Sequence, residues 1–311
     1  MRNGDGEQRT PPLDDDPGWT VIRPASGWFE LHLRDLWRYR DLVLLFVRRD
    51  FVSVYKQTVL GPLWFLLQPL LTTVMFTLVF GRLAGIPTDG VPPFLFYLAG
   101  ILPWTYFASC LNQTSNTFVA NASLFGKVWF PRLTVPVAVV INNLVTFAVQ
   151  SVLLVGFYAY FVARGASIAP SLALLAVPLL VVQLAALGLG CGIIVSSLTT
   201  RYRDLVHLVT FGVQLWMFAT PVVYPTSRIP ARWSWIVTVN PMAPVIEQFR
   251  HAILGTPGVG AVPTLVSVVA TAVLLVVGQV VITREARGLA ETVGRAPSSA
   301  LMFSRNATNS V

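Results

Sequence analysis

The chain has 311 residues and is 54% hydrophobic, while only 12% of its residues are Asp, Glu, Lys or Arg, about half the share found in a soluble domain. The charges lie between long apolar runs rather than within them, so water-soluble folds and their active-site motifs are excluded. The net charge of +8 fits basic loops held against an anionic membrane surface, and we expect no nucleic-acid partner.

The N-terminal region divides into a tail and an amphipathic helix. Residues 1–25 lack the apolar core of a signal peptide and carry an acidic run at 14–16, which predicts a disordered cytoplasmic tail. In residues 26–56, apolar and charged side chains fall on opposite helical faces, which predicts a helix lying in the membrane interface. Its Arg residues are candidates to bind a lipid phosphate headgroup, because a guanidinium matches phosphate geometry; the alternative is plain anchoring to anionic lipid. The candidate residues on this helix are Trp28, Arg34, Trp37, Arg38 and Arg40.

The transmembrane domain is predicted over residues 57–284. Residues 59–80 form a run of 22 residues without a charge, and about 20 apolar residues in a helix cross the hydrocarbon core. The fold class predicted is therefore all-α integral membrane, with six transmembrane helices. The six spans are predicted at 59–80, 94–118, 134–162, 171–198, 205–224 and 261–283. Residues 285–311 are expected to form a cytoplasmic C-terminal tail.

The segment 225–260 differs from the spans because Pro and Gly interrupt it repeatedly. Its apolar pieces are too short to cross a bilayer, which predicts two re-entrant helices buried against protein and placed to act as an outer gate. Glu247 precedes Arg250 and His251 by three and four residues, which favours a local ion pair; a gating or sugar-binding role is the alternative. The gate candidates are Trp233, Trp235, Asn240 and Glu247.

The distribution of basic residues predicts the orientation. Seventeen of the 22 Lys and Arg residues fall in the two termini and in the loops after the second and fourth predicted spans. An excess of this size places both termini in the cytoplasm.

The predicted spans carry almost no ionisable group; His207, near the start of the fifth, is the clearest. Ion-coupled transporters place such groups in mid-membrane, and the chain has no phosphate-binding Gly-Lys-Ser/Thr loop. The three His residues are scattered, which gives little support to a transferase. We therefore do not expect an enzyme, and if the chain moves a substrate, the driving energy has to come from another polypeptide.

Small residues leave one question open. Gly188 and Gly192 stand four residues apart in a predicted span, a spacing that allows close helix contact. The contact is either within the subunit or across a dimer. Cys110 and Cys191 lie in apolar runs and are interpreted as core residues rather than a disulfide.

Several motifs recur in a fixed order along residues 28–290. They are YKQTVLGPLW at 55–64, GILPW at 100–104, KVWFPR at 127–132, RYRD at 201–204, PVVYP at 221–225 and NPM at 240–242. In these motifs the chain resembles the permease subunits of bacterial polysaccharide (O-antigen or teichoic-acid type) ABC exporters, in the type-two ABC transporter permease family.

The resemblance implies a homodimer in the bacterial cytoplasmic membrane, paired with two copies of a separate ATPase. ATP and Mg would bind the ATPase, and no cofactor is expected in this chain. The implied substrate is an undecaprenyl-type lipid-linked glycan, and the loop at 121–132 would be the coupling element. The candidate coupling residues are Ser123, Lys127, Phe130, Arg132, Arg201 and Arg203.

Aromatic residues are frequent near the predicted span ends. They form either an interfacial belt or the lining of a conduit in which sugar rings stack. The conduit candidates are Trp64, Trp104, Phe107, Trp216 and Tyr224. The alternative functions are a type-two exporter of a small hydrophobic drug or lipid and, with less support, an integral-membrane transferase; neighbouring genes for an ATPase and sugar transferases would favour the polysaccharide exporter.

Overall fold

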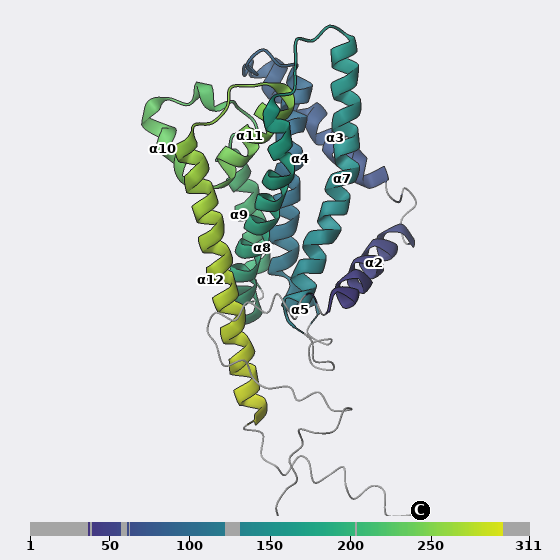
Figure 1. Cartoon of the computed structure of the whole chain (residues 1–311), viewed down its shortest axis with the longest axis vertical. Helices are drawn as coiled ribbons and strands as arrows, with labels where there is room; N and C mark the ends of the chain where they lie inside the picture. The colour runs from purple at the N-terminus through teal and green to yellow at the C-terminus, as the bar shows by residue number, and fades with distance from the viewer. Residues whose placement is uncertain are drawn as a thin grey trace, which may run out of the picture.

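The computed structural model describes residues 37, 39–56, 61, 63–121, 131–202 and 204–294. Over these residues the chain is a bundle of helices without a strand (Figure 1). Five of the described helices are long and apolar enough to cross a membrane, which confirms an all-α integral membrane protein. The predicted tail at 1–25, residues 295–311 of the C-terminal tail predicted at 285–311, and most of the loop at 121–132 lie outside the described residues; residues 285–294 continue helix α12.

The helices follow one another with short connections. The long ones are α3 (Leu63–Phe76, continued in π-helical geometry over Thr77–Leu83), α4 (Pro93–Ser115), α7 (Thr134–Ala163), α8 (Val177–Arg201, after the 3-10 turn Leu172–Ala176) and α12 (Ala261–Gly294). The shorter ones are α2 (Arg40–Lys56), α5 (Thr117–Ala120), α9 (Leu205–Phe218), α10 (Ser234–Val239) and α11 (Met242–Leu254), with 3-10 turns at Thr226–Arg228 and Ala231–Trp233.

The predicted fifth span, 205–224, is helical only over the 14 residues of α9. At 1.5 Å per residue such a helix is about 21 Å long, shorter than the hydrocarbon core of about 30 Å. The helix stops because Pro221 lacks a backbone N–H and disfavours helical geometry at Thr220. The count of six spans therefore stays a prediction, as does the re-entrant path of α10 and α11.

Helix α4 forms the centre of the bundle. Of its most apolar 18-residue window, 78% is buried inside the subunit, against 11–28% for the other four candidate spans. It contacts α3, α7, α8, α9 and α11, and Phe96, Tyr97 and Leu102 are among its buried side chains. Helices α3, α7 and α8 therefore pack around α4, α12 packs on α8, and these four helices present most of their surface outward.

Glycines set the close packing of α8 against α4. A Cβ added at Gly188 would lie 2.6 Å from the Cβ of Cys110, and one at Gly192 would lie 2.8 Å from Cγ2 of Thr114. Both glycines therefore serve contact within the subunit, which decides between the two alternatives left by the sequence.

Helix α2 is the described part of the predicted interfacial helix. Its Val43 and Phe46 are buried against Val135 and Ala138 at the start of α7. This contact ties α2 to the bundle at the N-terminal end of α7 (Figure 1).

Candidate functional site

Three predicted conduit aromatics meet between α4 and α9. The ring centroids of Trp104 and Phe107 are 5.5 Å apart, and Trp216 lies 6.2 Å from Trp104 and 5.2 Å from Phe107 in edge-to-face geometry. Such pairs add about 0.5–1.5 kcal/mol beyond the burial of their area. The cluster therefore fastens the short helix α9 to the central helix.

Asn240, between α10 and α11, joins this cluster to the segment 225–260. Its Oδ1 accepts hydrogen bonds from Nε1 of Trp216 at 3.2 Å and from the N–H of Met242 at 3.0 Å. Its Nδ2 donates to the Ala219 carbonyl at 3.2 Å and to Oγ1 of Thr220 at 2.9 Å. Both donors and both lone pairs of the amide are thus used, and the side chain is buried.

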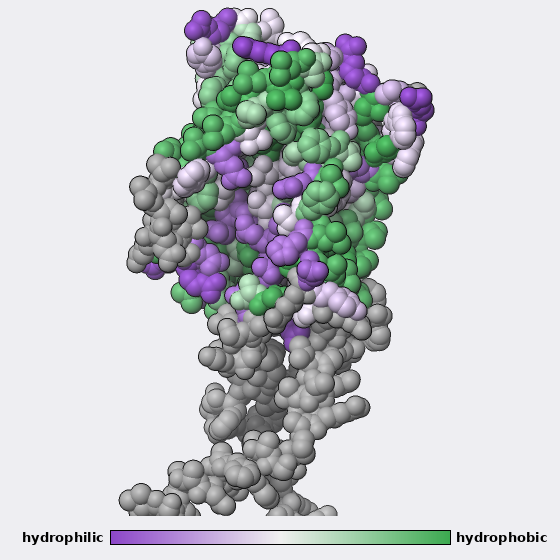
Figure 2. All heavy atoms as spheres, turned by 180° about the vertical axis from the view of Figure 1, so that it is seen from behind, coloured by the Kyte–Doolittle hydropathy of each residue, from purple (hydrophilic) through white to green (hydrophobic). Residues whose placement is uncertain are grey.

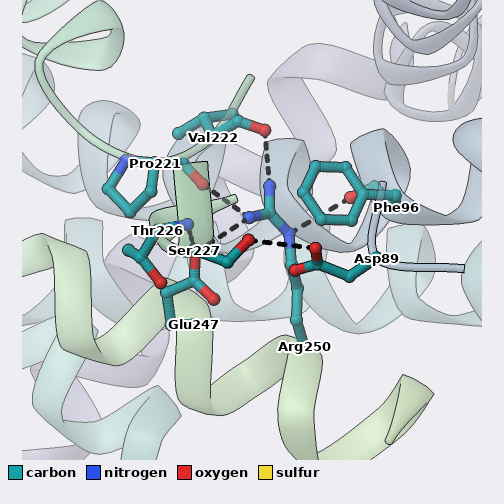
Figure 3. A network of polar contacts seen from close by, with 8 residues as sticks. All are labelled: Asp89, Phe96, Pro221, Val222, Thr226, Ser227, Glu247 and Arg250. Carbon is teal, nitrogen blue, oxygen red and sulfur yellow. Dashed lines mark hydrogen bonds and ion pairs between the residues drawn. The ribbon is translucent and has the colours of Figure 1, made fainter. Parts of the chain in front are cut away.

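Arg250, on α11, is the largest fully buried side chain described. Its Nη1 donates to the Pro221 carbonyl at 2.6 Å, its Nη2 to the Val222 carbonyl, and its Nε to the Phe96 carbonyl at 3.3 Å (Figure 3). The guanidinium carbon also lies 3.8 Å from the centroid of the Phe96 ring. One guanidinium therefore connects α11, α4 and the chain that follows α9.

Glu247, one helical turn before Arg250, is buried in the same place. Its Oε1 lies 3.6 Å from Nη1 of Arg250 and accepts a hydrogen bond from the N–H of Thr226 at 3.2 Å. Beside it, Oγ of Ser227 donates to Oδ1 of Asp89 at 3.0 Å (Figure 3). The local ion pair that the sequence favours for Glu247 is present, and both of its side chains are buried.

The charges of this pair depend on their surroundings, and both residues lie on α11, outside the five candidate spans. Burial raises the pKa of the Glu247 carboxyl, and the Arg250 guanidinium and the Thr226 N–H act in the opposite direction. Burial lowers the pKa of Arg250 to about 10, so it stays protonated at neutral pH. Removing either partner would leave a buried charge without compensation.

The predicted conduit aromatics differ widely in exposure. Phe107 is 0% exposed and Trp104 is buried, whereas Trp64 on α3 is 49% exposed. Trp216 and Tyr224 are half-buried, and the Tyr224 hydroxyl donates to the Phe218 carbonyl at 3.1 Å. A side chain buried inside one subunit does not reach a surface between two copies, so Phe107 can act on a path there only through its neighbours.

The predicted gate residues also fall into two groups. Trp233 and Trp235 are 47% and 59% exposed, and Arg232 lies over the Trp233 ring at 5.9 Å. Asn240 and Glu247 are buried in the contacts described above. The predicted gate residues are therefore two exposed rings and two buried polar side chains.

Much of the predicted coupling and headgroup sets lies outside the described residues. This holds for Ser123, Lys127, Phe130, Arg203, Trp28, Arg34, Arg38 and for the side chain of Arg201. Arg132 is half-buried at the start of α7, and Trp37 is exposed with the Arg40 guanidinium 5.4 Å from its ring centroid. Their assigned roles stay predictions.

One face of the subunit is not uniformly apolar. Figure 2 shows hydrophilic side chains gathered in a band that runs between hydrophobic areas on the face opposite to that of Figure 1. Exposed polar side chains on the neighbouring helices α3, α4 and α9 include Gln68, Gln113, Thr210 and Gln214. Polar groups at membrane depth face protein or water rather than lipid.

Sequence reasoning missed the role of Gly100. A Cβ at this position would lie against Nη2 of Arg250 and 3.1 Å from the Val222 carbonyl oxygen. The sequence feature that could have pointed to it is Arg250 within the apolar stretch 245–254, because a buried charge needs buried partners.

The described helices, five of which are long and apolar enough to cross a membrane, define a multi-pass all-α membrane protein. The model of the ABC-2 type transporter family matches residues 41–254, which covers α2 to α11. The chain belongs to this family and is a permease of that class.

Similar proteins include two named for export. The O-antigen export system permease protein RfbA of Klebsiella pneumoniae is 31% identical over 212 residues, which are 68% of this chain and 79% of the relative. RfbA of Myxococcus xanthus is 29% identical over 222 residues, 70% of this chain and 82% of the relative. Nodulation protein J of Sinorhizobium fredii is 26% identical over 218 residues, 68% and 81% of the two chains.

Proposed function

We propose that this chain is the permease subunit of an ATP-driven exporter that moves a lipid-linked cell-surface polysaccharide across the bacterial cytoplasmic membrane. The observation that carries the substrate class is the similarity to the O-antigen export permease of Klebsiella pneumoniae over 68% of the chain. An undecaprenyl-type carrier is the proposed lipid anchor of the glycan.

The driving energy is proposed to come from two copies of a separate ABC ATPase, which bind ATP and Mg²⁺. In the five described candidate spans, Arg82, at the end of the first, is the one Asp, Glu, Lys or Arg. Ion-coupled transport needs groups in mid-membrane that bind or release charge, so this composition supports an external motor.

The proposed path runs between two copies of the chain. A rigid glycan many sugars long has to be threaded, because a closed pocket cannot enclose it. The hydrophilic band of Figure 2 supports a surface that is turned away from lipid. Uncharged amide and hydroxyl groups and exposed rings suit a sugar chain, since sugars offer hydroxyl groups and flat C–H faces.

The proposed orientation places both termini in the cytoplasm. The loop 121–132, with Arg201 and Arg203, would then meet the ATPase, and α2 would lie at the leaflet where the lipid-linked substrate arrives. The excess of basic residues on that side supports this orientation.

The test is reconstitution of the permease with its cognate ATPase in lipid vesicles that contain the lipid-linked glycan. We expect ATP-dependent movement of the glycan to the opposite leaflet. Permease alone should hydrolyse no ATP, and an ATPase disabled in hydrolysis should move none. Movement of small lipids without movement of the glycan would contradict the proposed substrate class.

A further inference from the structure

The chain between α9 and α10 depends on donors from elsewhere. The carbonyls of Pro221 and Val222 lie in a non-helical stretch after α9, and Pro225 has no N–H to offer them. Arg250 provides the donors for the carbonyls of Pro221 and Val222. A buried carbonyl without a donor would cost free energy, so these contacts hold the connection in place.

The position of the guanidinium is fixed from three sides. Glu247 lies beside it on α11, the Phe96 ring lies under it on α4, and Gly100 leaves the space that it occupies. The planar fork of Arg fits this geometry, whereas the single ammonium of Lys cannot reach three carbonyls in the same way.

The two short helices of the outer segment differ in how they are held. Helix α11 has ten buried residues, from Met242 to Leu254, and contacts α4, α8 and α12. Helix α10 contacts α11 and α12 but has no buried residue, and its Trp235 and Val239 are among the exposed large side chains. Segments with few buried contacts open at the lowest free energy.

We propose that Arg250 is a positioning residue for the outer end of the transport path: it joins α11 and the connection 219–226 to α4 as one body, and it leaves α10 as the part of the outer segment that moves. The placement of this body at the outer end rests on the proposed function and orientation. The division into a fixed part and a moving part rests on the contacts alone.

The division is tested by hydrogen–deuterium exchange of the full chain in lipid nanodiscs. In the wild type, the amides of 242–254 should exchange at least tenfold more slowly than those of 234–239. Arg250→Lys should speed exchange in 219–226 and 242–254 severalfold while the other spans stay unchanged. Unchanged exchange in 242–254, or a uniform increase along the whole chain, would overturn the proposal.

A second variant acts on the same group from another helix. Gly100→Ala places a methyl group where the guanidinium lies, so it should loosen the same two segments. Combined with Arg250→Lys it should add little, because the displaced group is already gone. Gly156→Ala, where a Cβ would meet no atom within 4 Å, is the matched control and should leave exchange unchanged.

The positioning role is tested by leakage through the resting permease. Vesicles that contain Arg250→Lys or Gly100→Ala should leak a small hydrophilic dye severalfold faster than the wild type or Gly156→Ala, without ATP. Loosened exchange without a change in leakage would leave Arg250 a purely structural residue and overturn the positioning role. Absence of glycan export in the wild type would refute the proposed substrate. The exchange and leakage measurements would still test the role of Arg250.

Discussion

The side-chain amide of Gln150 on α7 donates to the carbonyl of Phe65 on α3 at 3.1 Å. This carbonyl has no helical partner, because the residue four positions later is Pro69. A buried Gln therefore satisfies the acceptor that a proline exposes within a candidate span. The bond connects α3 to α7.

We expect Gln150→Leu to lower stability by about 1 kcal/mol, because a buried carbonyl loses its donor. In the background of Pro69→Ala, which restores the helical N–H, the same substitution should cost close to nothing. The thermal midpoint of the four proteins in detergent measures this cycle. Equal losses in both backgrounds would show that Gln150 does not serve the Phe65 carbonyl.

Gly188→Val should destabilise the subunit by at least about 1–3 kcal/mol, since the new side chain would collide with Cys110 on α4. The folded yield after solubilisation measures the loss. Gly156→Val, in open space, should be tolerated. Recovery of Gly188→Val as a stable monomer in place of a dimer would point instead to a contact between copies.

Asn240→Ala should cost more than Trp216→Phe. The first removes four hydrogen bonds and leaves buried donors and acceptors unpaired, at about 1–3 kcal/mol per group. The second removes one bond and keeps the apolar ring. Thermal midpoints of the two variants provide the comparison, and an equal or reversed order would be evidence against Asn240 as the joint of α9, α10 and α11.

Phe107→Ala and Trp64→Ala should affect different quantities. Phe107 is fully buried, so its truncation should reduce folded protein, at about 3–5 kcal/mol. Trp64 is half-exposed on α3, so Trp64→Ala should keep the folded yield. Its effect should appear in the export of long glycans, measured by the length distribution at the cell surface. A loss of folded protein in Trp64→Ala would remove the support for a path-facing ring.

Charge reversal at Lys127 or Arg132 should weaken ATP-driven export more than membrane insertion, because both lie in the predicted coupling element. Arg164→Glu, an exposed charge on the opposite predicted side and outside the segment 225–260, is the matched control. Export per hydrolysed ATP is the measurement. Normal coupling in both reversed variants would exclude this loop as the transmission point.

The sequence by itself determined the class and the broad order of elements. Long uncharged runs can be satisfied in a membrane by helices, since all backbone groups then pair within the run. The same logic separated the Pro- and Gly-broken segment 225–260 from the long apolar runs, and it contains the short helices α10 and α11. Motif order indicated the family that the match over residues 41–254 establishes.

Only the tertiary structure decided which apolar run is central, which aromatic rings are buried and where the charge of Arg250 lies. Lipid tails are as apolar as a protein core, so hydropathy alone does not distinguish α4, which is mostly buried, from α3, which is mostly exposed. The same holds for Phe107 and Trp64. Burial depends on the neighbours that the fold brings together, and the carbonyls that hold Arg250 come from residues 28, 29 and 154 positions away.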